Sequence, residues 1–467
     1  MNYSNSIHQI AMDLGRKIIK RTENGEIQDL DLMAKDIAED CRTSARAMLE
    51  ATLKYLNESV REDKSERKQR GLVIKEKDRP REIYTELGRI RWSRDYYYDK
   101  QNAKYTALLD RILNIPEYGR IGNEVSAKLV NNAAEMSYAK AAKEVSDGEI
   151  SRQTVRNHIL KLQVPEKQPD EKRSPEVLHI YADEDHVHMQ KPKKERGKRN
   201  QIVPLVTVSE GIEKVSERRN RTIRPMHFVD EEFNGKQLWE SVEGYIAKAY
   251  DTEALKHIYV HGDGGKWIEK GLNAFKRTKH VIDGYHYQKE LDRICKRFSK
   301  RNVRTVITTA ITNDDKHKVD HFLHTLMEGA PEEDVAAAKR FGTYLLNQWV
   351  PIRNYVTLDI PGSCTEGQIS HVLSERFSRN PMGWSRKGLA KLSKIRVLNL
   401  NGQKITAADF RGEQEETYRE YGERMIQEYV KGCTDWSVFE REVPIYDTNA
   451  GMQRLLQAYG QNHGVLN

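Results

Sequence analysis

Cysteine is scarce in this sequence, and the four that occur lie far apart. No Cys-x-x-Cys pair is present, which argues against a structural zinc site, and the spacing gives no sign of a disulfide framework. We therefore expect four reduced thiols, at Cys41, Cys295, Cys364 and Cys433.

Long apolar runs are also missing. No stretch approaches the roughly 20 apolar residues that a membrane-spanning helix needs. Residues 1–20 lack the apolar core of a secretory signal. These two absences predict a soluble, cytoplasmic protein.

The chain has little excess charge of either sign. Lys and Arg total 78 against 70 Asp and Glu, a formal net charge of +8. A surplus this small permits nucleic-acid binding without establishing it, so the position of the positive clusters matters more. With 37% hydrophobic and 32% charged residues over 467 positions, the sequence is polar but can fold. At roughly 100 to 200 residues per domain, it predicts two to four domains.

The first part of the chain changes from a helical to a strand period. Apolar residues recur at three- and four-residue steps from Ile7 to about Glu66, which predicts two helices packed on each other. Residues 81–86 and 89–98 then alternate aromatic or branched side chains with charged ones, on either side of Leu87-Gly88. This pattern predicts a β-hairpin.

A helix-turn-helix layout follows between residues 135 and 160. A short Ala-rich helix is expected from Ser137 to Val145, then a turn at Asp147-Gly148, then a second helix with Ser151 as its N-cap. An ordinary helical hairpin with a solvated polar face is the alternative. Polar and basic side chains crowd the start of the second helix and favour DNA binding through Arg152, Gln153, Thr154, Arg156 and Asn157.

The remainder of the chain has an α/β pattern. Residues 163–175 hold three prolines and dense charge, which is typical of a linker, so we place a domain boundary there. Strands are expected at 177–182, 186–190, 202–208, 256–261 and 280–282, a helix at 236–250, and almost continuous helix over 288–350 with a break near Gly329-Ala330-Pro331.

Two acids are expected at strand ends, where side chains from distant parts of an α/β chain converge. Asp183 follows the strand at 177–182, and Asp263 follows the strand at 256–261 with a glycine on each side. Asp185 lies two residues beyond Asp183 and would share its strand face if the strand continued, which makes it the rival for the same role. A single Asp in such a place is commonly a cap or turn residue. The pair suits Mg²⁺, which prefers oxygen ligands, although a third acid is then needed.

Four blocks of the sequence resemble a known family. They are Tyr181–Gln190, His261–Ile268, Asp283–Lys289 and Gly362–Gly388. They are similar to blocks of bacterial insertion-sequence transposases of the ISLre group, long catalogued as an uncharacterised protein family and related to Mutator-like transposases. The likeness runs from about residue 30 to residue 410. It implies an α/β RNase H-like catalytic core, interrupted by an all-α insertion, with an Asp-Asp-Glu triad.

The resemblance also implies which residues form the triad. Asp183 matches the first acid, although Glu184 replaces the glycine that relatives often carry after it. Asp263 matches the second acid and Glu366 the third, with Asp185 and Glu375 as runners-up. Asp263 lies 80 residues beyond Asp183, and Glu366 lies 103 residues beyond Asp263, so an inserted helical module must lie between the last two.

Other residues of these blocks are candidates for contact with DNA. His286 could contact the scissile phosphate or orient a carboxylate, or it could be a buried histidine at the strand end. Trp384 could stack on an unpaired base or pack beneath the Glu366 helix. Arg376 and Arg379 are candidates for phosphate contact. Three basic clusters, at 191–199, 218–224 and 296–304, favour a polyanionic partner and include Lys191, Lys193, Lys194, Arg218 and Arg219.

Together these features predict a DNA transposase of the bacterial cytoplasm, associated with the nucleoid. It would bind double-stranded DNA at the element's terminal inverted repeats and use two Mg²⁺ or Mn²⁺ ions for cleavage and strand transfer, with no covalent protein intermediate. A homodimer or larger synaptic oligomer is expected. The alternatives are a metal-dependent nuclease or resolvase without strand transfer, and a non-catalytic DNA-binding regulator.

The same features divide the chain into seven segments. They are a helical region (1–70), a β-hairpin and helical region (71–130), the helix-turn-helix (131–165), the first part of the core (176–287), the helical insertion (288–355), the second part of the core (356–410) and a C-terminal helical region (411–467).

Overall fold

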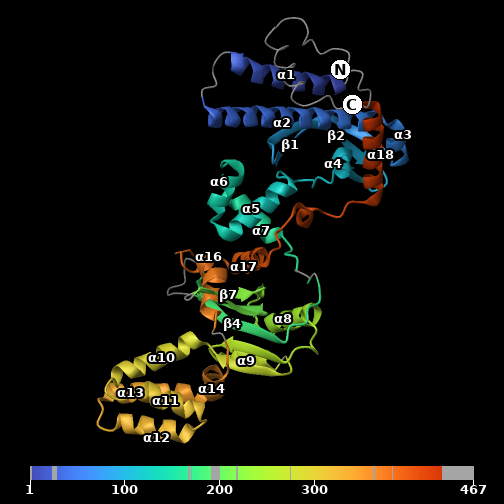
Figure 1. Ribbon diagram of the computed structural model, residues 1–467. Helices are drawn as coiled ribbons and strands as arrows, with labels where there is room; N and C mark the ends of the chain where they lie inside the picture. Colours follow the sequence, from blue (N-terminus) through green and yellow to red (C-terminus); the bar gives the residue numbers. More distant parts are fainter. Residues whose placement is uncertain are drawn as a thin grey trace, which may run out of the picture. The chain divides into compact units, whose positions relative to one another are not determined.

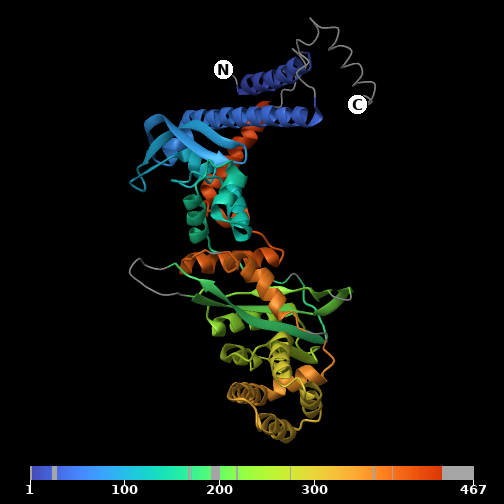
Figure 2. The same ribbon diagram turned by 90° about the vertical axis from the view of Figure 1, so that its left-hand side faces the viewer.

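The computed structural model describes residues 3–23, 29–166, 169, 171–190, 200–216, 219–273, 275–360, 363–380 and 382–433 (Figures 1 and 2). Two compact units divide the chain. Unit 1 spans Met1–Gly122 and Arg411–Asn467 as far as these are described, and unit 2 spans Asn123–Phe410. The division into seven segments stays a prediction.

Unit 1 packs a small antiparallel sheet against helices. Its elements are α1 (Tyr3–Glu23), α2 (Leu30–Glu62), α3 (Lys64–Gln69), β1 (Leu72–Thr85), β2 (Gly88–Asp99), β3 (Lys104–Thr106), α4 (Leu108–Ile112) and α18 (Glu416–Cys433), with sheet order β1-β2-β3. The helical N-terminal region and the hairpin are thus confirmed. The hairpin turn lies at Glu86 and Leu87, and β1 begins well before the expected strand.

A cluster of polar side chains connects α2 to β2 by hydrogen bonds. Asp95 on β2 is fully buried, and its carboxylate accepts hydrogen bonds from Arg61 Nε at 2.7 Å and Nη2 at 2.6 Å. Asn57 Oδ1 accepts from the Asp95 backbone N–H at 2.8 Å. Because a buried charge is costly unless it is paired, this cluster fixes the packing of the hairpin on α2.

Unit 2 begins with three short helices. They are α5 (Asn123–Glu135), α6 (Tyr138–Ser146) and α7 (Arg152–Lys161), which pack on one another. Asp147 (φ +49°) and Gly148 (φ +90°) form the turn between α6 and α7 in the left-handed region. The Ser151 hydroxyl accepts from the Thr154 N–H at 3.2 Å and caps α7. The two predicted helices and the turn between them are therefore present, as both the helix-turn-helix and the helical-hairpin interpretations require.

A mixed five-stranded sheet forms the centre of unit 2. Its order is β10-β9-β4-β5-β8, where β4 pairs antiparallel with β5 and parallel with β9. The strands are β4 (Val177–His188), β5 (Asn200–Ser209), β8 (Met226–Phe228), β9 (His257–Gly262) and β10 (Thr278–Ile282), beside a separate hairpin of β6 (Gly211–Ser216) and β7 (Arg219–Ile223).

One expectation about this sheet is wrong. The strands expected at 177–182 and 186–190 are a single strand, β4, so Asp183 lies inside a strand and not at its end. The reason is that antiparallel pairing with β5 continues without interruption from Asp183↔Leu205 to His188↔Asn200.

The two faces of β4 have different partners because side chains alternate along a strand. Leu178, Ile180 and Ala182 pack with α8 (Gly235–Ala249) in a buried apolar core. The opposite face carries Tyr181 and Asp183 and is covered by α15 (Thr365–Ile369), which continues through a π-helical turn (Ser370–Ser374) into α16 (Glu375–Phe377). Such π-turns frequently occur at functional sites.

A helical module separates β10 from α15, as the sequence predicts. It consists of α10 (Gly284–Arg297), α11 (Val303–Thr312), α12 (Lys316–Met327), α13 (Glu332–Asn347) and α14 (Trp349–Thr357), with its own buried core. Figure 1 shows these helices in yellow and orange. Asn354 on α14 donates to the His280 carbonyl at 2.7 Å and ties the module to the sheet edge. The described residues of unit 2 also form α9 (Lys266–Leu272), α17 (Arg386–Leu400) and a short 3-10 helix (Ala407–Phe410).

Candidate metal centre

Asp183 lies on β4 just beyond the end of its parallel pairing with β9. Their parallel pairing ends at Tyr181↔His261, and the next residue of β9, Gly262, approaches β4 so closely that an added Cβ would lie 3.0 Å from the Ala182 carbonyl oxygen. A side chain at Gly262 would therefore push the two strands apart beside Asp183. Gly262 therefore meets a packing requirement of the sheet.

The pKa of Asp183 is raised to about 7. Burial is the largest cause; the Glu184 N–H, which donates to Asp183 Oδ1 at 2.8 Å, lowers it, and the charges of Asp263, Asp283 and Glu366 raise it. Three acidic side chains therefore lie close enough to Asp183 to disfavour its charged form. A cation bound beside Asp183 would offset this repulsion.

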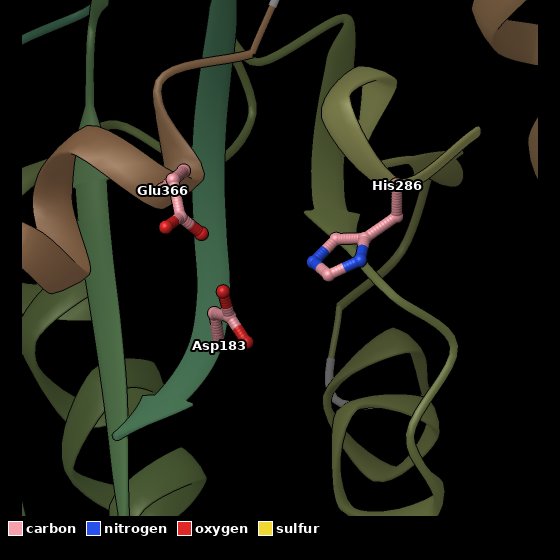
Figure 3. A group of neighbouring side chains, drawn as sticks. All are labelled: Asp183, His286 and Glu366. Atoms are coloured by element: carbon pink, nitrogen blue, oxygen red, sulfur yellow. The ribbon is translucent and has the colours of Figure 1, made fainter. Parts of the chain in front are cut away.

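Glu366 and His286 complete a compact group with Asp183. One ligand atom of each residue lies within 4.8 Å of the others. Figure 3 shows the two carboxylates facing each other, with the His286 ring approaching from one side. Glu366 is in the first turn of α15 and His286 in the first turn of α10, so helix starts carry both side chains to the face of β4.

Asp263 lies beside this group and not within it. It follows β9, is exposed, and its Oδ1 accepts from the Gly265 N–H at 2.9 Å. Gly264 between them has φ +89°, a conformation that favours glycine. The carboxylate thus has a turn-stabilising contact as well as proximity to Asp183.

Asp283 is a fourth acid that the sequence analysis did not select. It follows β10 as Asp263 follows β9, and it is only 2% exposed. Its Oδ2 has no hydrogen-bond partner among the described residues and lies 3.8 Å from His286 Nε2. Its position directly after a predicted strand could have identified it. From the block Asp283–Lys289, only His286 was selected as a candidate.

The two runner-up acids have other surroundings. Asp185 is on the same face of β4, is buried, and burial raises its pKa. Glu375 Oε1 lies 3.0 Å from His371 Nδ1, and its Oε2 lies 3.7 Å from an Arg396 nitrogen. The structure brings Glu366, and not Glu375, next to Asp183.

Two of the candidate DNA contacts are structural instead. Arg376 is buried and donates to the carbonyl oxygens of Ala133 at 3.0 Å and Met136 at 2.7 Å, so it ties α16 to α5 and is not on the surface. Trp384 is 7% exposed and donates to the Phe377 carbonyl at 3.0 Å, which places it in the core as a packing residue.

The other candidate contacts differ in exposure. Arg379 is exposed, with one guanidinium nitrogen 3.6 Å from Glu375 Oε1. On α7, Gln153 donates to Asn157 at 3.0 Å, and the Thr154 hydroxyl lies 3.0 Å from the capping Ser151. Arg152, Gln153 and Asn157 are exposed, and Thr154 and Arg156 are half-buried. Lys191, Lys193, Lys194 and Arg218 lie outside the described residues, and Arg219 begins β7.

A pocket of about 600 Å³ adjoins the acids. Asp283 and Glu366 lie at one side of it, and α10 supplies three cations, Lys289, Arg293 and Lys296. These three recur at four- and three-residue steps and so share one face of the helix. The sequence analysis included only Lys296 in a basic cluster, although the helical spacing of all three was visible.

The chain belongs to an uncharacterised protein family, UPF0236, whose model matches residues 22–415. Two UPF0236 proteins of Caldanaerobacter subterraneus subsp. tengcongensis are each 35% identical over 408 residues, 86% of this chain and 82% or 83% of the relative. A third protein from that organism is 36% identical over 366 residues, 76% of this chain and 75% of the relative, and its name joins many loci.

One solved structure is also similar, at a low level. It is the Drosophila P element transposase strand transfer complex, with a TM-score of 0.19 and 12% identity, covering 65% of this chain and 90% of that one. Across the described ranges, no helix is long and apolar enough to cross a membrane.

Proposed function

We propose that this protein is a DNA transposase that cleaves and joins DNA by metal-dependent phosphoryl transfer. The observation that carries the proposal is the convergence of Asp183 and Glu366, with His286, on one face of β4. Asp263 and Asp283 flank this group. The resemblance to insertion-sequence transposases implies that three of these acids, Asp183, Asp263 and Glu366, form the catalytic triad.

The strand arrangement supports an RNase H-like core. In unit 2 the central strand β4 has an antiparallel neighbour that follows it directly and a parallel neighbour, β9, that follows later. Asp183 lies on the central strand and Asp263 directly after its parallel neighbour. The helical module of residues 284–357 then interrupts the core before α15 presents Glu366.

The donor set fits Mg²⁺ or Mn²⁺. Carboxylate oxygens are the ligands that both ions prefer, and an imidazole nitrogen is better tolerated by Mn²⁺. The buried Asp283 oxygen has no partner in the described part of the chain, and the pKa of Asp183 is raised by burial and by its acidic neighbours. A cation would relieve both conditions. We therefore propose that Asp183, Glu366 and Asp263 hold up to two ions, with Asp283 and His286 in support.

The chain's own residues would position DNA at this centre. Lys289, Arg293 and Lys296 line the adjoining pocket and can contact phosphates on either side of the cut. His286, in contact range of Asp283, would keep that carboxylate oriented. Bound Mg²⁺ would activate the attacking oxygen and stabilise the leaving oxygen. The protein forms no covalent bond in this scheme, so catalysis comes from positioning and charge neutralisation.

DNA recognition is assigned to the N-terminal part of unit 2. Arg152, Gln153 and Asn157 are exposed at the start of α7, where a recognition helix contacts base edges. We propose that this helix binds the terminal inverted repeats of the element. Two ends must be held together for transposition, so the active form would be a dimer or a larger oligomer. The name of one relative joins many loci of a single organism, and a mobile element that copies itself would produce such a pattern.

The test is an end-joining assay. The full chain is incubated with Mg²⁺, labelled duplexes from the two ends of the element that carries this gene, and a supercoiled target plasmid. We expect cleavage at the element ends followed by covalent joining of the new 3′ ends to the plasmid. Cleavage without joined product would instead indicate a nuclease or resolvase. Binding without cleavage, both in Mg²⁺ and in a parallel reaction with Mn²⁺, would indicate a DNA-binding regulator.

A further inference from the structure

The three-stranded sheet of unit 1 has a buried face and an aromatic face. Tyr97 on β2 is fully buried and packs with α2 residues such as Leu56 and Val60. Because side chains alternate along a strand, its neighbours Tyr96 and Tyr98 lie on the opposite face. Tyr105 on β3 is paired with Tyr98 across the strands, so it lies on that face too. Figure 2 shows β1 and β2 against one side of α2.

The three tyrosine rings form one cluster. The rings of Tyr96 and Tyr105 are stacked, with centroids 5.8 Å apart and an interplanar angle of 3°. The Tyr98 ring is tilted by 60° against Tyr105 at 5.2 Å. Tyr105 is 54% exposed, so the cluster is open to solvent and not part of the core. Exposed clusters of aromatic side chains often mark sites that bind another molecule.

Cations border the rings. The Arg79 guanidinium lies 4.7 Å from the centroid of Tyr96, and the Lys75 ammonium lies 5.6 Å from that of Tyr98. Lys77 and Lys104 are exposed on the same strands. Two acids lie among them: Glu76, 3.8 Å from Arg79, and Asp78, which pairs with Arg61. The border is therefore basic on balance.

Aromatic rings beside cations match the chemistry of an unpaired nucleic-acid strand. Bases offer flat faces for stacking, and the phosphates that follow each base attract Lys and Arg. A duplex keeps its base faces inside the stack and presents only base edges in its grooves. The exposed ring of Tyr105 therefore suits a single strand better than a duplex.

We propose that this tyrosine face, made of Lys75, Arg79, Tyr96, Tyr98 and Tyr105, binds single-stranded DNA. A base stacks on Tyr105, and Lys75 and Arg79 contact the flanking phosphates. The tyrosine face belongs to unit 1, whereas the residues of the metal centre belong to unit 2. It does not depend on catalysis by Asp183 or Glu366.

Photocrosslinking tests the position of the strand directly. The full chain is mixed in EDTA with a single-stranded oligonucleotide carrying 5-iododeoxyuridine, irradiated, digested and analysed by mass spectrometry. We expect crosslinked peptides that contain Tyr98 or Tyr105, and we expect unlabelled single strand to compete better than duplex of the same sequence. Crosslinks found only outside residues 72–106, or equal competition by duplex, would overturn the proposal.

A pair of variants separates stacking from folding. Tyr105→Ala should weaken binding of the single strand at least about fivefold, since each stacked base contributes that much or more. Tyr105→Phe keeps the ring and should bind like the wild type. The Ala variant loses the ring contacts with Tyr96 and Tyr98, so thermal melts of both variants are recorded and binding is compared at a temperature where both are folded. Equal affinity of the Ala variant and the wild type, or equal losses in the Ala and Phe variants, would contradict stacking at Tyr105. Failure of the end-joining assay would leave this result unaffected.

Discussion

Asp183 and Glu366 lie far apart in the sequence, but their carboxylates meet within 4.8 Å on the face of β4. The helical module between β10 and α15 intervenes in the chain and folds as its own core, so it does not interrupt the sheet. After the module the chain returns across β4, and the first turn of α15 presents Glu366. The proposed phosphoryl-transfer activity requires that these two carboxylates lie close enough to share a metal ion.

The first prediction separates Glu366 from Glu375. Glu366→Gln removes a charged ligand from the proposed metal centre and should lower the rate of DNA cleavage about 100-fold or more. Glu375→Gln changes a residue that contacts His371 and Arg396 and should retain activity within a fewfold range. Single-turnover cleavage of element-end DNA measures both. Full activity in the Glu366 variant with loss in the Glu375 variant would reverse the assignment.

The second prediction concerns pH and metal. In the metal-free protein the pKa of Asp183 is about 7, above its ordinary value of 3.8, so the folded state binds more protons than the unfolded state between those values. Stability from this group is therefore full below pH 3.8 and is lost as pH rises to 7. A bound cation requires the carboxylate, so the rise in melting temperature on adding Mg²⁺ should be larger at pH 8 than at pH 6.

Asp183→Asn is the control for this pH dependence. The variant cannot ionise at that position, so its Mg²⁺-induced shift in melting temperature should be small at both pH values. Thermal melts of wild type and variant with and without Mg²⁺ provide the measurement. A wild-type shift that is equal at pH 6 and pH 8 would argue against a titrating ligand.

The third prediction tests the polar cluster of unit 1. Arg61→Ala leaves the fully buried Asp95 carboxylate without its guanidinium partner and should lower the free energy of unfolding by about 3 to 5 kcal/mol. Asp78→Asn removes the charge of the other partner of Arg61 and keeps a residue type that tolerates the left-handed backbone there (φ +54°). Because the Asp78 side chain is 61% exposed, this change should cost less than about 1 kcal/mol. Denaturant titrations compare the two. Similar losses in both variants would mean that the buried pair contributes no more than the exposed one.

The fourth prediction concerns the cations of α10. If Lys289 contacts a phosphate, Lys289→Ala should reduce the slope of log affinity against log salt by about 0.9 for duplex DNA. Lys236 on α8 does not line the pocket, and Lys236→Ala should leave the slope unchanged. Fluorescence anisotropy at several salt concentrations measures both. An unchanged slope in the Lys289 variant would place the DNA elsewhere.

Local signals in the sequence predicted much of the fold. Ser151 caps the second helix by accepting from the N–H three residues later, and Asp147-Gly148 forms the left-handed turn before it. Both are short-range features, so the two helices and their turn could be predicted from the residues alone. The helical period of the module was equally local. Strand continuity at Asp183 was not, because it depends on pairing with β5, which residues 183–188 do not reveal by themselves.

The site was predictable only in part, for a similar reason. Resemblance supplied Asp183, Asp263 and Glu366, but the burial of Asp283 depends on how β10 and α10 pack, which no spacing encodes. Arg376 shows the reverse error. A basic residue in a block that resembles transposases suggests phosphate contact. The Arg376 guanidinium instead donates to the carbonyl oxygens of Ala133 in α5 and of Met136 just after α5, which lie far away in the sequence.

The most direct test of the metal centre is a crystal of the protein grown or soaked with Mn²⁺ and examined by anomalous diffraction. The account predicts an anomalous peak bound by carboxylate oxygens of both Asp183 and Glu366, which disappears in Asp183→Asn. A peak held instead by Asp185 or Glu375, or no peak beside Asp183 in crystals that bind Mn²⁺ elsewhere, would contradict it.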